Sequence, residues 1–203
     1  MQFTTLFSIS LITAIVFGKF TETANPTTAT KDSIATEQVK PERKEKKTVK
    51  KIESKSKLSK AEKYIERFKK TAVQEMKQFG IPASITLAQG IVESNSGQSS
   101  LSVKENNHFG IKCKSKCGCK CAIYADDKPD DKFRIFKSAW YSYREHSKLL
   151  TSPRYKHLHK LKKTDYKGWA RGLKKAGYAT HPHYDKMLIK IIETYDLHKY
   201  DKL

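Results

Sequence analysis

The chain has 203 residues and a formal net charge of +20. Such a basic composition suits nucleic acid, anionic lipid or anionic wall polymer as a partner. The sequence has no RNP1 pattern, no C2H2 finger and no basic region with heptads, so no nucleic-acid partner is expected. It also has no HExxH motif or other paired histidine spacing, so its histidines are interpreted as surface or packing residues.

Residues 1–24 are predicted to be a signal peptide. Residues 6–18 are apolar apart from Ser8, Ser10 and Thr13, which is the length of a signal-peptide core and short for a membrane span of about 20 residues. An uncleaved N-terminal anchor is the alternative. Either interpretation predicts export to the periplasm, the cell surface or the medium, and no stable membrane span is expected.

Residues 25–57 are predicted to form a disordered basic linker. They are rich in Thr, Lys, Glu and Ser, contain no aromatic residue, and carry twice as many basic as acidic residues. Such a segment cannot bury enough apolar surface to offset the entropy of ordering. We interpret it as a solvated spacer, with electrostatic tethering to an anionic envelope polymer as the weaker alternative.

A first core-facing helix is predicted up to Phe79. Ser59 and Glu62 have the spacing of a capping box, an apolar stripe follows at helical spacing, and Gly80 ends the helix. Residues 58–203 are long enough for one domain with a sizeable core.

An uncharged helix is predicted over residues 83–92, with Pro82 at its start and Glu93 at its end. Such a helix is largely buried. Burial and the negative end of the helix dipole both raise the pKa of a carboxyl placed there. A carboxyl that keeps its proton near neutral pH can be the general acid of glycoside hydrolysis. A solvated glutamate at a helix end is the alternative interpretation.

Four cysteines lie close together in the sequence CKSKCGCKC: Cys113, Cys117, Cys119 and Cys121. Clustered cysteines are typical of local disulfides or of a structural metal site. Export favours disulfides, three pairings are possible in principle, and the spacing departs from the paired Cx2C signature of zinc sites. Either way we expect a structural role beside the active cleft.

Two further helices are predicted after the strand at Phe133. Ser138 starts one that runs to Leu150, with Trp140 and Tyr143 among its inward candidates. Asp165 caps a second helix that runs to Ala176.

The last helix is predicted to open at Thr180 or His181, with Pro182 in its first turn. Tyr178 precedes it on a loop, where an aromatic hydroxyl can stack on a sugar and also hydrogen-bond to it. A core tyrosine is the alternative interpretation of Tyr178.

Five segments, in order along residues 58–200, resemble the endo-β-N-acetylglucosaminidases of glycoside hydrolase family 73, which are bacterial peptidoglycan hydrolases. They are IPASITLAQGIVES, NNHFGIK, FRIFKSAWYSYREHSKLL, SPRY and GYATHPHYDKMLIKII. The resemblance implies that Glu93 is the catalytic glutamate and that Tyr178 is the tyrosine of the GYAT motif. It also implies a second acidic residue upstream of the FRIF strand, for which Asp127 and Asp126 are the first candidates, with Asp130 and Asp131 behind them.

Together, the residues and the resemblance predict an α+β, lysozyme-like domain that is mainly helical with a small β lobe. The expected reaction is hydrolysis of the β-1,4 bond after N-acetylglucosamine in peptidoglycan, by a monomer without a cofactor. Glu93 would protonate the leaving oxygen, Asp127 or Asp126 would orient water or stabilise developing charge, and Asn107 and Phe109 would shape the cleft floor. The alternatives are a catalytically degenerate glycan-binding wall module and, more remotely, nucleic-acid binding through the lysine-rich linker.

Overall fold

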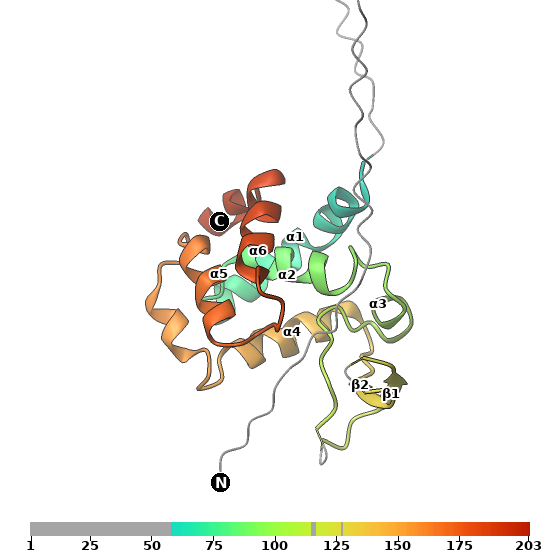
Figure 1. The fold of residues 1–203 in the computed structure, drawn as a ribbon. Coiled ribbons are helices and arrows are strands. Elements are labelled where there is room, and N and C mark those ends of the chain that lie inside the picture. The colour runs from blue at the N-terminus through green and yellow to red at the C-terminus, as the bar shows by residue number, and fades with distance from the viewer. Residues whose placement is uncertain (1–57, 115–116, 127) are drawn as a thin grey trace, which may run out of the picture. The chain divides into compact units, whose positions relative to one another are not determined.

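The computed structural model describes residues 58–203, except residues 115–116 and 127 (Figure 1). The predicted signal peptide, residues 1–24, and the predicted linker, residues 25–57, lie outside the described residues, and so does Asp127.

The described part is mainly helical and has a two-stranded antiparallel sheet, as expected for an α+β domain (Figure 1). In chain order, the elements are α1 (Lys60–Phe79), α2 (Ala83–Glu93), α3 (Ser100–Glu105), β1 (Cys121–Tyr124), β2 (Asp131–Arg134), α4 (Ala139–Leu150), η1 (Lys156–Lys160), α5 (Tyr166–Lys175), α6 (Tyr184–Thr194) and η2 (Leu197–Lys202). None of the described helices combines the length and the apolar character needed to cross a bilayer.

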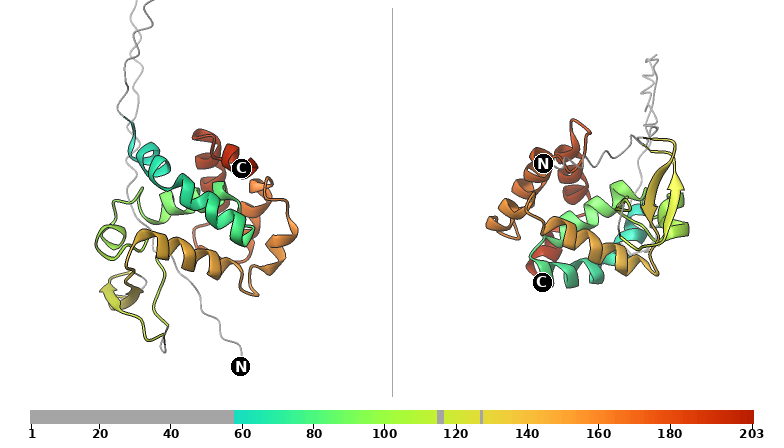
Figure 2. Two further views of the ribbon diagram at one scale, coloured as in Figure 1. Left: turned by 180° about the vertical axis from the view of Figure 1, so that it is seen from behind. Right: turned by 90° about the horizontal axis from the view of Figure 1, so that it is seen from below.

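Helix α2 lies in the middle of the helical part. It packs against α1, α5, α6 and η2, and the views agree that these elements and α4 surround it (Figures 1 and 2). Residues 83–91 are all buried, as an uncharged helix predicts. Its first turn is held by Asp201 of η2, whose carboxylate accepts bonds from the Ser84 amide (2.8 Å) and hydroxyl (2.6 Å). The packing of α2 in the core therefore determines the position of Glu93 at its end.

Local sequence determines the ends of α1. The predicted capping box is present: the Ser59 hydroxyl accepts from the Glu62 amide, and the Glu62 carboxylate accepts from the Ser59 amide. At the other end, Gly80 adopts the left-handed conformation, with φ of 75°, and its amide donates to the Met76 carbonyl.

The β hairpin lies at one end of the helical part, next to α3 (Figures 1 and 2). Cys121 is paired with Arg134 at one end of the sheet, and Tyr124 with Asp131 at the other. Glu105, the last residue of α3, accepts a hydrogen bond from the Tyr124 hydroxyl at 3.0 Å and one from the Phe136 amide at 2.9 Å. These bonds join the hairpin to the helical part.

Two expectations for the C-terminal half are wrong. Trp140 does not point inward: it is 39% exposed and lies under the Arg144 guanidinium, whereas Tyr143 and Leu150 are buried as expected. Helix α6 begins at Tyr184 and not at Thr180 or His181. The residue before a proline is disfavoured in helical geometry, so Pro182 delays the start of the helix.

Candidate active site

Glu93 is the last residue of α2, and the chain turns sharply after it. Asn95, Ser96 and Gly97 all have positive φ, between 50° and 75°. The buried Ser94 hydroxyl holds this turn, because it donates to the Gly90 carbonyl at 2.5 Å and accepts from the Gly97 amide at 2.7 Å. Glu93 as a whole residue is partly accessible, while its carboxyl is largely removed from water.

The pKa of the Glu93 carboxyl is raised from 4.5 to about 8. Burial is the main cause, because an ionised carboxylate loses its hydration there. The negative charge of Asp126 raises the pKa further, while a hydrogen bond from Tyr184 lowers it. The predicted rise is confirmed, and Glu93 is protonated at neutral pH.

A chain of buried hydrogen bonds leads from Glu93 into the core. The Tyr184 hydroxyl donates to Glu93 Oε1 at 2.7 Å. Gln89 Nε2 donates to that hydroxyl at 3.2 Å, and Gln89 Oε1 lies 3.1 Å from His146 Nε2. An amide oxygen can only accept, so His146 must carry its proton on Nε2. Burial lowers the pKa of His146 to about 3, which keeps the ring neutral.

Tyr178 lies beside this chain, although it is only 3% exposed. Its ring stacks on Tyr184, with the centroids 5.6 Å apart and an interplanar angle of 23°. The charge of Glu93 contributes to raising the pKa of Tyr178, which places the two groups within electrostatic range. Among the described residues, none hydrogen-bonds the Tyr178 hydroxyl.

Asn107 and Phe109 are both buried. Asn107 Nδ2 donates to the Ile111 carbonyl at 2.9 Å and to the Arg134 carbonyl at 3.0 Å, and Asn107 Oδ1 accepts from the Ile111 amide at 3.0 Å. Phe109 stacks on His146, with the centroids 4.1 Å apart. Asn107 thus fixes the loop before the hairpin, and Phe109 packs against His146 of the hydrogen-bond chain. That either residue shapes a cleft floor stays a prediction.

Among the candidate second acids that the structure describes, Asp126 is the one whose charge acts on Glu93. Lys112 Nζ lies 3.1 Å from Asp126 Oδ2 and 2.9 Å from Asp131 Oδ2, so one ammonium holds both carboxylates at the hairpin. Asp131 also accepts from the Lys128 amide, at 3.1 Å. Asp130 lies in the exposed turn between the strands.

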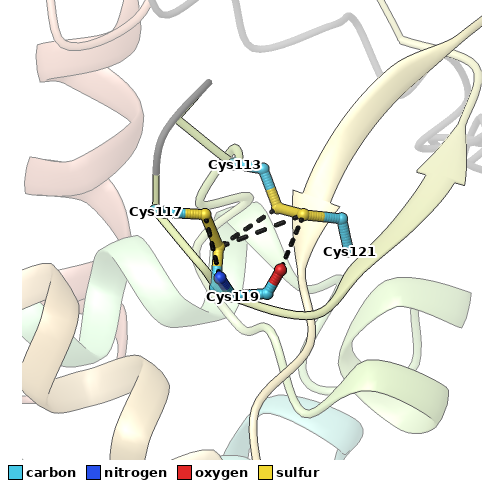
Figure 3. A group of neighbouring side chains, drawn as sticks. All are labelled: Cys113, Cys117, Cys119 and Cys121. Carbon is cyan, nitrogen blue, oxygen red and sulfur yellow. Dashed lines mark hydrogen bonds between the residues drawn. A yellow bond between two sulfur atoms is a disulfide. The ribbon is translucent and has the colours of Figure 1, made fainter.

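The four cysteines form two disulfides, Cys113–Cys121 and Cys117–Cys119, at the base of the hairpin (Figure 3). Cys121 is the first residue of β1, so the bond to Cys113 closes the segment that precedes the sheet. The sequence left this pairing open.

Sequence reasoning missed Tyr184, Gln89 and His146 as members of the site. The Tyr184 side chain is buried, and its hydroxyl faces Glu93. One local signal was available for Gln89. It is an amide in an otherwise apolar stretch, one helical turn before Glu93, and therefore on the same face of α2.

Comparison with known proteins identifies the family. Residues 69–197 match the glucosaminidase family, described as mannosyl-glycoprotein endo-beta-N-acetylglucosaminidase. The exo-glucosaminidase LytG of Bacillus subtilis is 33% identical over 139 residues, which are 62% of this chain and 48% of LytG, so the chain spans about half the length of that relative.

Solved structures show the same fold. The catalytic domain of the autolysin Auto of Listeria monocytogenes is 26% identical, with a TM-score of 0.61 over 71% of this chain and 89% of that domain. A peptidoglycan hydrolase of Sphingomonas sp. A1 is also 26% identical, with a TM-score of 0.59 over 70% of this chain and 92% of that protein. The predicted lysozyme-like fold and the resemblance are confirmed, and the chain belongs to the glucosaminidase family, a family of glycoside hydrolases.

Proposed function

We propose that this protein hydrolyses the β-1,4 bond after N-acetylglucosamine in peptidoglycan, with Glu93 as the general acid. The observation that carries the proposal is the Glu93 carboxyl, whose pKa is raised to about 8 by burial and which receives a bond from Tyr184, on a residue that is itself partly accessible. Such a group is protonated at neutral pH and is oriented for donation to a leaving oxygen. The family match and the names of the relatives, an autolysin and a peptidoglycan hydrolase, support the substrate.

Asp126 is our candidate for the second carboxylate. It lies on the hairpin, its charge reaches Glu93, and Lys112 holds it by an ion pair. In that position it orients water or stabilises the oxocarbenium-like charge of the transition state. Asp127, the next residue, is also a candidate for the second carboxylate on the basis of the sequence.

Tyr178 is our candidate for holding the N-acetyl sugar, because it lies within electrostatic range of Glu93 and its ring stacks on Tyr184, which bonds to Glu93. Asn107 acts by fixing the loop that follows it, and Phe109 acts by packing on His146. We further propose that the protein is exported and acts outside the cytoplasmic membrane, where this substrate lies.

The test is release of reducing ends from purified peptidoglycan by the full chain and by Glu93→Gln, with mass spectrometry of the products. Loss of a general acid lowers the rate by about 10²–10⁴-fold, and the variant should keep its fold by circular dichroism. The matched control is Glu66→Gln, an exposed glutamate of α1 paired with Lys69, which should retain full activity.

The products separate the alternatives. Fragments that end in reducing N-acetylglucosamine, absent with Glu93→Gln, establish both the bond and the acid. Their length distinguishes endo from exo cleavage. Full activity of Glu93→Gln would exclude the acid role. Binding of both proteins to the polymer without any release would favour a glycan-binding module that lacks catalysis.

A further inference from the structure

We propose that the four-cysteine loop is also a metal site. In this proposal, Cys113, Cys117, Cys119 and Cys121 bind one Zn²⁺ as four thiolates when their sulfurs are reduced. The disulfide form described above and the zinc form are then two closed states of the same loop. The proposal does not depend on the assignment of Glu93.

The four sulfurs are gathered at one place, where they could share one ion after reduction of the disulfides (Figure 3). All four Sγ atoms lie within 4.8 Å of one another. Four sulfurs at about 2.3 Å from a tetrahedral zinc ion are about 3.8 Å apart. Cys119 Sγ already lies 3.6 Å from Cys113 Sγ and 4.0 Å from Cys121 Sγ. Only the two bonded pairs have to separate, and reduction of the disulfides releases them.

The backbone of the loop supports the same arrangement. Gly118 has φ of 59°, in the left-handed region that favours glycine, and it turns the chain between Cys117 and Cys119. The Cys119 amide donates to Cys117 Sγ at 3.3 Å, and an N–H bond to sulfur stabilises the thiolate form. The other two cysteines are anchored by the hairpin, because the Cys113 amide donates to the Lys132 carbonyl and Cys121 is paired with Arg134.

The charge around the loop favours thiolates. A zinc ion with four thiolates carries a net charge of −2, and lysines alternate with the cysteines at positions 114, 116 and 120. Ammonium groups this close in the sequence compensate part of that negative charge. Cys117 and Cys121 are exposed and the other two are half-buried, so both a reductant and a metal ion can reach the sulfurs.

The chemistry balances with a dithiol as the reductant. Each disulfide takes up two electrons and two protons from one dithiol, which is itself oxidised to a disulfide, and the loop gains four thiols in total. Binding of Zn²⁺ then displaces four protons and forms four Zn–S bonds. Cys121 is the first residue of β1, the strand that leads to Asp126. The disulfide form and the zinc form would therefore both keep the base of this hairpin closed.

The test uses the full chain, reduced with excess dithiol, loaded with ZnCl₂ without oxygen, and freed of unbound ion by gel filtration. Native mass spectrometry and elemental analysis should show one zinc ion per chain. Loading with Co²⁺ should give the visible bands and the thiolate charge-transfer band of a tetrahedral four-sulfur site. The air-oxidised chain should bind neither ion, because its sulfurs are occupied by disulfides.

Two variants locate the ion. Replacement of all four cysteines by serine should abolish zinc binding, and the wild-type chain with alkylated thiols provides the same comparison if that variant does not fold. Replacement of His181 and His183 by alanine, a pair whose ring centroids lie 6.2 Å apart, should leave one zinc ion bound. Reduced protein that binds no zinc, or zinc that persists after alkylation, would overturn the proposal.

Discussion

The Glu93 carboxyl is removed from water at the end of α2, and its pKa rises from 4.5 to about 8. The folded protein therefore holds a proton that the unfolded chain releases between these pH values. The stability contributed by this group is complete below pH 4.5 and is lost as the pH rises through about 8. Ionised Glu93 thus destabilises the fold at alkaline pH.

Glu93→Gln should consequently be more stable than the wild type at pH 8.5, by on the order of 1–3 kcal/mol, because glutamine has no charge to desolvate. Near pH 4 the two proteins should differ little. Denaturant unfolding at both pH values measures this. Glu66→Gln, on the exposed face of α1, should show no such pH-dependent difference, and a gain for Glu93→Gln that is equal at both values would contradict the assigned pKa.

Tyr184 and Gln89 act on the Glu93 carboxyl through the hydrogen bond that Tyr184 donates to it. The bond from Tyr184 lowers the pKa of Glu93, and Gln89 fixes the Tyr184 hydroxyl as the donor. Tyr184→Phe should raise the pKa of Glu93 further, so the alkaline limb of the pH–rate profile should move to higher pH while the maximum rate falls about tenfold or more. Gln89→Leu should act in the same direction but more weakly.

The matched control for these variants is Tyr166→Phe, which removes a hydroxyl bonded to the exposed Glu193. It should leave the pH profile unchanged. If Tyr184→Phe lowered only the stability and the alkaline limb stayed in place, Tyr184 would be a packing residue and not a positioning residue.

Helix α2 approaches its neighbours most closely at Gly90. The Tyr64 and Tyr143 hydroxyls, joined by a 2.8 Å hydrogen bond, lie against this position, and an added Cβ would collide with Tyr64 Oη. Alanine favours helices over glycine by about 1 kcal/mol, but overpacking a core costs about 1–3 kcal/mol. Gly90→Ala should therefore destabilise the protein in denaturant unfolding.

Lys63→Ala on the exposed face of α1 provides the reference for Gly90→Ala, because surface changes stay within about 0.5 kcal/mol. A more stable Gly90→Ala protein would mean that helix propensity outweighs the contact between α2 and the two tyrosines.

Helices with local signals were predictable, and elements set by distant contacts were not. The capping box of α1, the buried character of α2 and the Asp165 cap of α5 are all encoded within a few residues. Helix α6 starts later than predicted, because Pro182 disfavours helical geometry in the residue before it.

The residues of the site show the same difference between local signals and distant contacts. The environment of Glu93 followed from the uncharged residues before it, and the resemblance supplied Tyr178. Tyr184, however, meets Glu93 across 91 residues of sequence, and His146 meets Gln89 across 57. No periodicity encodes such contacts, because they depend on how α4 and α6 pack around α2.

For the whole molecule, the net charge of +20 predicts binding to anionic polymers that weakens with salt. Most of this charge lies in residues 58–203, and residues 25–57 carry a smaller excess of basic residues. Deletion of residues 25–57 should therefore weaken, but not abolish, binding to insoluble peptidoglycan with its anionic polymers, and should leave the rate on soluble glycan fragments unchanged. Co-sedimentation at low and high salt measures the binding, and peptidoglycan stripped of anionic polymer is the control. Complete loss of binding on deletion would instead assign the polymer interaction to the linker.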